Sequence, residues 1–164
     1  MKRSFALLLF LVLAVPAWGQ DYKKGANAAS RGDYVEALKW YRKAAEQGSV
    51  EAHYQLGILY YNGRGVTKDV ARGIKWHRRA AENGHSVSQF ILGSAYFFGK
   101  DVPQNSIEAM KWYRRAAEQG DASGQFALGG MYSHDSSVPQ ELRFPAAWPS
   151  ISVASSRSTA LMVA

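Results

Sequence analysis

The four histidines are the side chains of this 164-residue sequence best suited to acid–base catalysis or metal binding: His53, His77, His85 and His134. They are spread along the chain without an H-E-x-x-H pattern or another ligand spacing, and no nucleophile is paired with a base at a spacing typical of catalysis. The sequence contains no cysteine, which excludes disulfides and cysteine-based metal sites. We therefore predict a protein that is not an enzyme and that holds no metal and no cofactor.

Two glycine-rich segments invite comparison with phosphate-binding loops: 63–66 (Gly-Arg-Gly-Val) and 99–102 (Gly-Lys-Asp-Val). A phosphate loop requires a Lys-Ser or Lys-Thr pair that begins the following helix, and neither segment has one. We interpret both segments as backbone bends between helices.

A tryptophan recurs at a constant interval, at Trp40, Trp76 and Trp112, since 76 − 40 = 36 and 112 − 76 = 36. The same step relates Lys39 to Lys75 and Lys111, Ala44-Ala45-Glu46 to Ala80-Ala81-Glu82 and Ala116-Ala117-Glu118, Leu56-Gly57 to Leu92-Gly93 and Leu128-Gly129, and Tyr60 to Tyr96 and Tyr132. This self-similarity predicts a repeat architecture. Segments such as 37–46 and 52–60 carry apolar residues at three- and four-residue spacing, which is typical of amphipathic helices. The predicted fold class is all-α, an α-solenoid of helix-turn-helix hairpins.

Residue types also indicate where the second helix of each hairpin begins and ends. Residues that can cap free backbone N–H groups precede it at one repeat position: Asp33, Asp69 and Asn105. Glu36 and Glu108 complete a capping-box pattern with the first and last of these. Glycines follow the helix where a residue with positive φ commonly ends one: Gly48, Gly84 and Gly120.

Glycine also recurs inside the first helix of each hairpin, at Gly57, Gly93 and Gly129. Each costs about 1 kcal/mol relative to alanine in a helix. We expect a close approach of the second helix to offset this cost, through the Ala-Ala pairs that follow each tryptophan, with the tryptophans filling the wider parts of the contact. A bulky residue at these glycines is then expected to splay the hairpin.

The repeat combines three motifs in order: Ala-x-x-x-Leu-Gly-x-x-Tyr, Gly-x-x-Val and Lys-Trp-Tyr/His-Arg-Lys/Arg-Ala-Ala-Glu-x-Gly. Over about residues 21–140, this pattern resembles the Sel1-like repeat, a relative of the tetratricopeptide repeat. The resemblance implies an exported bacterial protein built as a right-handed superhelix, with a concave wall formed by the first helix of each hairpin. It also implies a protein or peptide ligand. The first hairpin, with its tight turn at Arg31-Gly32, is similar to a tetratricopeptide hairpin.

On this resemblance, the candidate partner-binding residues follow the concave wall: Tyr54, Ile58, Tyr61, Asn62, Phe90, Ser94, Phe97, Phe98, Phe126, Gly130, Ser133 and His134. Among them, Tyr61, Phe97 and Phe98 are the strongest candidates for exposed contacts, because aromatic side chains bring a large contact area at a small entropic cost. The alternative, in which these aromatic residues pack between hairpins, remains open.

The expected organisation is a signal peptide at 1–19, a tetratricopeptide-like hairpin at 20–48, Sel1-like repeats at 49–84 and 85–120, a truncated repeat at 121–140 and a disordered non-repeat tail at 141–164. The signal peptide is inferred from Lys2 and Arg3 before the apolar run 5–15, with small residues at Ala17 and Gly19 for cleavage. It predicts a periplasmic or secreted protein without stable membrane insertion after processing. A membrane anchor is the alternative, although the run is short for a span of roughly 20 residues.

The tail departs abruptly from the repeat. Pro145 and Pro149 interrupt the helix that the repeat would place there. Either a native tail or a reading-frame change in the gene accounts for this switch, and in both cases the last hairpin lacks its second helix. Because solenoids need capping units, we expect marginal stability or self-association at this end.

Two other functions stay open. Cysteine-rich secreted proteins of the resembling family are associated with β-lactam binding or hydrolysis, although this chain lacks their repeat-spaced cysteines. The formal charge of +7, or +5 without Lys2 and Arg3 (7 − 2 = 5), admits acidic partners or an RNA-binding helical repeat. We interpret the basic residues as a solvated helix face and predict no nucleic-acid partner, because an exported protein rarely meets RNA.

Overall fold

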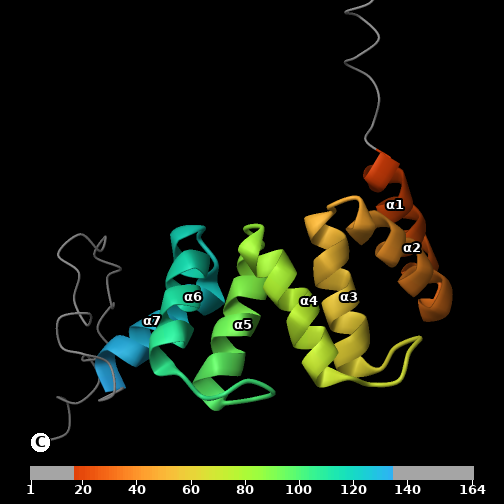
Figure 1. Ribbon diagram of the computed structural model, residues 1–164. Coiled ribbons are helices and arrows are strands. Elements are labelled where there is room, and N and C mark those ends of the chain that lie inside the picture. The colour runs from red at the N-terminus through yellow and green to blue at the C-terminus, as the bar shows by residue number, and fades with distance from the viewer. Residues whose placement is uncertain (1–16, 135–164) are drawn as a thin grey trace, which may run out of the picture.

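The computed structural model describes residues 17–134, which form α-helices and no strand (Figure 1). The helices of this part are α1 (Ala17–Ser30), α2 (Tyr34–Glu46), α3 (Val50–Asn62), α4 (Val70–Glu82), α5 (Ser86–Phe98), α6 (Ser106–Glu118) and α7 (Ala122–His134). The predicted all-α fold class is confirmed. Most of the expected signal peptide and the whole of the expected tail at 141–164 lie outside the described residues.

The helices pair in chain order and stack side by side into one row (Figure 1). Within hairpins, α1 packs against α2, α3 against α4 and α5 against α6; between hairpins, α2 meets α3, α4 meets α5 and α6 meets α7. The core is accordingly a series of clusters along the row, as expected when each repeat contacts its neighbours. After the first hairpin, one leucine of each first helix is fully buried in these clusters: Leu56, Leu92 and Leu128.

Side-chain caps fix the beginning of each second helix, as the sequence predicted. The Oδ1 atoms of Asp33, Asp69 and Asn105 accept hydrogen bonds from the backbone N–H three residues on, at 3.0, 2.8 and 3.0 Å. The predicted C-terminal glycines all have positive φ: Gly48, Gly84 and Gly120. Caps of the first helices had no clear sequence signal and are Ser49, His85 and Asp121.

The capping-box expectation needs correction, because the two glutamates make other contacts. The Glu36 carboxylate accepts hydrogen bonds from Trp40 Nε1 at 3.3 Å and from Arg31 at 3.4 Å. The Glu108 carboxylate accepts one from Lys111 Nζ at 2.6 Å. The backbone N–H groups of Asp33 and Asn105 donate instead to the carbonyl oxygens of Ala28 and Tyr96.

The cap at Asp69 leads to a simple test of helix ends. We expect Asp69→Ala to lower the free energy of unfolding by about 1 kcal/mol, because the N–H of Arg72 loses its acceptor. Asp69→Asn keeps a side-chain oxygen and is the matched control, expected to stay within a few tenths of wild type. Urea unfolding followed by circular dichroism measures both, and equal losses in the two variants would contradict the capping role.

The close helix approach predicted at the first-helix glycines is present, but its partner differs from the one expected. A Cβ atom at Gly57 would lie 2.6 Å from the His77 ring, and one at Gly93 would lie 2.7 Å from the Tyr113 ring. These rings belong to the residue after each tryptophan, because the rotation of about 100° per residue turns that position toward the first helix. A Cβ atom at Gly129 would have no neighbour within 4 Å in the described part of the chain, and the next step of the repeat (113 + 36 = 149) falls outside that part.

The Ala-Ala pairs and the tryptophans also take part in contacts between hairpins. A Cβ atom at Gly124 in α7 would lie 2.7 Å from the Cβ of Ala116, at the junction of α6 with the next hairpin. Trp112 shares a buried cluster with Ile74 and Ala81 of the preceding hairpin. The indoles also contact the first helix of their own hairpin, as expected, because the Trp76 ring stacks on His53 of α3 with ring centroids 5.6 Å apart and the Trp40 ring centre lies 4.3 Å from Lys24 Nζ of α1. The small residues and the indoles thus form contacts between repeats in addition to the expected contacts within a repeat.

Candidate functional site

An open groove of about 490 Å³ lies between the second and third hairpins. Its lining residues come from α3, α4, α5 and the bend after α5: Ile58, Tyr61, Asn62, Ile74, His77, Phe90, Ile91, Ser94, Ala95, Phe98 and Lys100. Most of the exposed wall is apolar. Ligand-binding clefts commonly measure about 300–1,000 Å³, so the groove is large enough for a short stretch of peptide.

The structure brings part of the sequence-derived candidate set together in this groove. The candidates that line it are Ile58, Tyr61, Asn62, Phe90, Ser94 and Phe98. The residues that sequence reasoning missed are Ile74, His77, Ile91, Ala95 and Lys100. These come from the second helix, from neighbouring faces of α5 and from the bend, whereas the family resemblance pointed only to the first helices.

The other candidates lie outside the groove. The Tyr54 ring stacks on His85 with centroids 4.3 Å apart, and Phe97 packs on the cluster formed by α6 and α7. Phe126 is 85% exposed on α7, and the hydroxyl of Ser133 donates to carbonyls of its own helix. Packing between elements is therefore the observed role of Tyr54 and Phe97.

The last two candidates, Gly130 and His134, belong to α7. Gly130 is exposed on α7 and does not line the groove. His134 is the last residue of α7, and the expectation for its side chain lies outside the described part of the chain.

Lys100 is the one charged side chain among the groove-lining residues. Its Nζ donates a hydrogen bond to the Tyr61 hydroxyl at 2.8 Å and lies 5.2 Å from the centre of that ring. The hydrogen bond to Tyr61 raises the pKa of Lys100, and the charge of Asp101 acts in the same direction. An exposed ammonium group is thus fixed at the rim of an apolar groove.

His77 is the deepest polar residue of the groove. Its side chain is buried, and its Nδ1 lies 3.3 Å from the hydroxyl of Ser88. Burial, with a contribution from His85, lowers the pKa of His77 to about 4, so the imidazole is neutral near pH 7. Sequence spacing did not reveal this serine–histidine pair. Ser88 is fully buried, so its hydroxyl is not accessible to a substrate, and the pair serves packing.

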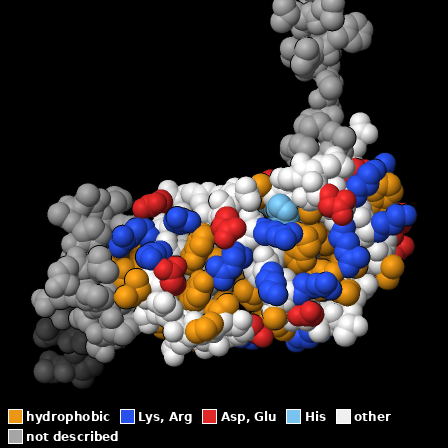
Figure 2. Space-filling view, in the orientation of Figure 1, with side chains coloured by type: hydrophobic (Ala, Val, Ile, Leu, Met, Phe, Trp, Pro, Cys, Tyr) orange, Lys and Arg blue, Asp and Glu red, His pale blue; other side chains and the backbone are white. Residues whose placement is uncertain are grey.

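Arginines of the second helices are engaged in contacts between hairpins. Arg42, Arg78 and Arg114 donate hydrogen bonds to Tyr60, Tyr96 and Tyr132 of the following hairpin. On the face shown in Figure 2, Lys and Arg side chains are spread along the row among hydrophobic and acidic ones. Part of the positive charge therefore has a structural role in joining repeats.

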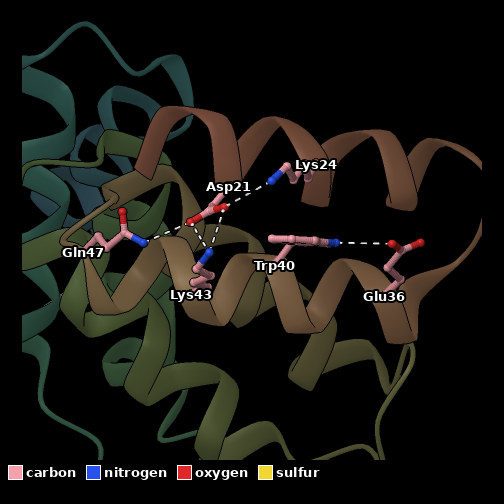
Figure 3. A network of polar contacts seen from close by, with 6 residues as sticks. All are labelled: Asp21, Lys24, Glu36, Trp40, Lys43 and Gln47. Carbon is pink, nitrogen blue, oxygen red and sulfur yellow. Dashed lines mark hydrogen bonds and ion pairs between the residues drawn. The ribbon is translucent and has the colours of Figure 1, made fainter. Parts of the chain in front are cut away.

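A polar network ties α1 to α2 at the other end of the row (Figure 3). The buried Asp21 carboxylate lies 3.2 Å from Lys43 Nζ and 3.8 Å from Lys24 Nζ, and it accepts a hydrogen bond from Gln47 at 3.0 Å. Burial raises the pKa of Asp21, but the hydrogen bonds and the two ammonium groups outweigh it and leave the pKa below its ordinary value. The Lys24 ammonium also lies 4.3 Å from the Trp40 ring centre.

Residues 17–134 contain neither a cluster of potential metal ligands nor a membrane-spanning helix. No three His, Asp or Glu side chains of this part come together as a potential metal site. None of its helices combines the length and the apolar character needed to cross a bilayer.

Comparison with known families identifies the repeat. A family model described as the Sel1 repeat matches residues 18–49, 50–85 and 86–121, which is more than half of the chain. The chain belongs to the Sel1 repeat family. The first hairpin is matched as a Sel1 repeat as well, although its connection is shorter than those of the later hairpins.

Solved structures give the same result for this Sel1 repeat protein. The Escherichia coli protein c5321, described as a protective antigen of uropathogenic strains with an SLR fold, is 38% identical with a TM-score of 0.67, and the match covers 71% of this chain and 26% of that one. A Sel1 repeat protein from Oxalobacter formigenes is 33% identical with a TM-score of 0.69, covering 81% and 57%. Cysteine rich protein B of Helicobacter pylori is 21% identical with a TM-score of 0.55 and supports the fold alone.

Among curated proteins, HcpE of Helicobacter pylori, named for a proposed β-lactamase activity, is 36% identical over 66 residues, which are 38% of this chain and 19% of HcpE. HRD3B of Arabidopsis thaliana, a component of an ERAD-associated E3 ubiquitin-protein ligase, is 40% identical over 52 residues, covering 32% of this chain and 8% of HRD3B. The chain thus matches only about a fifth or less of the length of these two relatives.

Proposed function

We propose that this Sel1 repeat protein is a non-catalytic interaction scaffold that binds a protein or peptide in the groove between its second and third hairpins. The observation that carries the proposal is the groove itself, which has mainly apolar walls, an exposed Phe98 and a cation at the rim. Apolar clefts with a few polar groups are typical binding sites. Sel1 repeats commonly serve as protein-interaction scaffolds, which is consistent with this role.

Selection from a displayed library of random peptides tests the proposal with defined probes. We expect the purified wild-type chain to enrich peptides rich in large apolar residues. Phe98→Ala is expected to weaken their binding about tenfold or more, because an exposed aromatic side chain in a binding groove commonly contributes a large share of binding energy. Phe126→Ala is the matched control, since Phe126 is also largely exposed but lies on α7 outside the groove.

Two outcomes of this selection would overturn the proposal. In the first, the wild-type chain enriches no peptide. In the second, Phe98→Ala and Phe126→Ala bind the selected peptides equally well, which would place the binding site elsewhere. Thermal melts of both variants accompany the measurement, and both are expected to match wild type because the two phenylalanines are mostly solvent-exposed.

The proposed setting is the periplasm or the exterior of a bacterial cell, after removal of a signal peptide. Support comes from the basic and apolar amino-terminal residues and from the bacterial relatives. Cleavage after Gly19 would retain Asp21, whose carboxylate joins α1 to α2. Sequencing the amino terminus of the exported protein tests this directly, and an intact Met1 in the envelope fraction would refute cleavage.

The similarity to HcpE raises β-lactam hydrolysis as a second activity to compare. The groove residues do not support it, because the buried Ser88 beside His77 cannot be reached by a substrate. A chromogenic β-lactam assay on the purified protein distinguishes the two functions. The scaffold proposal expects no turnover, and turnover that survives Ser88→Ala and His77→Ala would reveal a site elsewhere in the chain.

A further inference from the structure

We infer that the groove accepts a large apolar side chain with an acidic residue beside it in an extended peptide, and that His77 creates the space for the apolar side chain. This inference rests on the proposed peptide-binding function and specifies its ligand. It is drawn from a difference between the second hairpin and its neighbours.

The residue that covers the first-helix glycine is not the same in every hairpin. Tyr41 covers Gly25 and Tyr113 covers Gly93, whereas His77 occupies the same repeat position over Gly57. The phenol of Tyr113 extends across its hairpin and donates a hydrogen bond to Ser94 at 3.1 Å. A tyrosine in this position therefore reaches the side chain that directly follows the covered glycine.

The second hairpin has no tyrosine side chain to fill the corresponding space beside its first helix. The residue equivalent to Ser94 is Ile58 (94 − 36 = 58), and both Ile58 and His77 line the groove. The shorter imidazole lacks the outer part of the tyrosine ring and its hydroxyl. Ile58 is larger than Ser94 and takes up part of this difference, and the remaining space beside His77 adjoins the groove that both side chains line.

The rim of the groove carries a positive charge. Among residues 17–134, Lys100 is the only charged side chain that lines the groove, and the Tyr61 hydroxyl accepts a hydrogen bond that holds its ammonium group at the rim. A carboxylate is the complementary partner, because hydrogen bonds between ionised groups are stronger than neutral ones. The groove is open to solvent beyond Phe98, which is 72% exposed, so a peptide chain can continue past the rim. We therefore assign the carboxylate to an internal Asp or Glu side chain.

Peptide selection followed by direct titration tests this specificity. Wild type is expected to enrich peptides with Asp or Glu within one or two residues of Phe, Leu, Ile or Trp. Selected peptides are then synthesised with amidated ends, with the acidic residue kept or replaced by its amide, and titrated by fluorescence anisotropy. We expect the amide version to bind roughly tenfold more weakly to wild type, and both versions to bind alike to Lys100→Gln.

Variants that fill the groove test the role of His77. His77→Tyr restores the residue type of the neighbouring hairpins and is expected to abolish peptide binding. Ile91→Trp fills the groove from α5 and leaves the contact between His77 and Gly57 unchanged. Peptide binding is compared for those of the two variants that melt at the wild-type temperature. Lys39→Gln, on the exposed face of α2, is the charge control for Lys100→Gln.

The results separate this inference from the broader proposal. Peptides that bind the groove without acidic preference, or that bind folded His77→Tyr or Ile91→Trp as tightly as wild type, would overturn the inference and leave the scaffold function standing. A neutral peptide that gains tight binding from a free terminal carboxylate would overturn the assignment to a side chain. Failure of wild type to enrich any peptide would overturn both.

Discussion

Replacing Gly93 by alanine is expected to lower the free energy of unfolding by about 1–2 kcal/mol, whereas the same change at Gly129 is expected to raise it by up to about 1 kcal/mol. Both glycines occupy the same repeat position inside a first helix. A Cβ atom at Gly93 would lie 2.7 Å from the Tyr113 ring and 3.2 Å from the backbone oxygen of Ala109, whereas one at Gly129 would have no neighbour within 4 Å among residues 17–134. Alanine improves helix propensity at both sites, so these contacts separate them.

The ring of Tyr113 has little freedom to move away from an added methyl group. It is buried, its hydroxyl donates to Ser94, and it packs against Phe90 with centroids 5.7 Å apart. Urea unfolding of the two variants and of the double variant measures the difference. A gain in stability from Gly93→Ala would show that the ring does not cover this glycine and would contradict the packing described for the hairpins.

Lowering the pH from 7 to 4 is expected to reduce the free energy of unfolding. The reason is that burial, with a contribution from His85, lowers the pKa of His77 from its ordinary 6.5 to about 4. The folded state therefore binds fewer protons than the unfolded state between these values. Stability contributed by the neutral imidazole is complete above pH 6.5 and is lost as the pH falls through 4. The lost free energy of unfolding is about 3 kcal/mol, since one pKa unit corresponds to about 1.4 kcal/mol.

The control for the pH prediction is His77→Tyr, which removes the titrating group and keeps an aromatic ring over Gly57. The variant should lose much less stability than wild type between pH 7 and pH 4. The residual loss is expected from His53 and His85, whose pKa values are lowered by burial in the same direction. Parallel stability curves for wild type and variant would show that His77 is not buried in the neutral form.

Much of the fold could be predicted because residue types that mark the ends of helices recur at the same positions of each repeat. Asp69 and Gly84 mark helix ends through interactions within a few residues, so the sequence alone indicates them. Packing partners are harder to predict. Trp76 and His77 are neighbours on one helix, and only their rotation about the helix axis decides which of them faces Gly57.

The candidate site was predicted in part for a related reason. Residues such as Ile58 and Phe98 share the face of a repeating first helix, and the family resemblance was sufficient to select them. Lys100 lies in a bend whose path depends on tertiary structure. His77 has no ligand or catalytic spacing in the sequence, and its effect on the groove becomes clear only when its ring is compared with that of Tyr113.

The most direct test of the groove is a map of amide chemical-shift changes when the tightest selected peptide is added to the purified protein. The largest changes are predicted at groove-lining positions of α3 and α5, including Ile58, Tyr61 and Phe98, with little change along the exposed side of the second helices. Changes concentrated at Lys39, Lys75 and Lys111, with the groove residues unaffected, would contradict the proposed binding site.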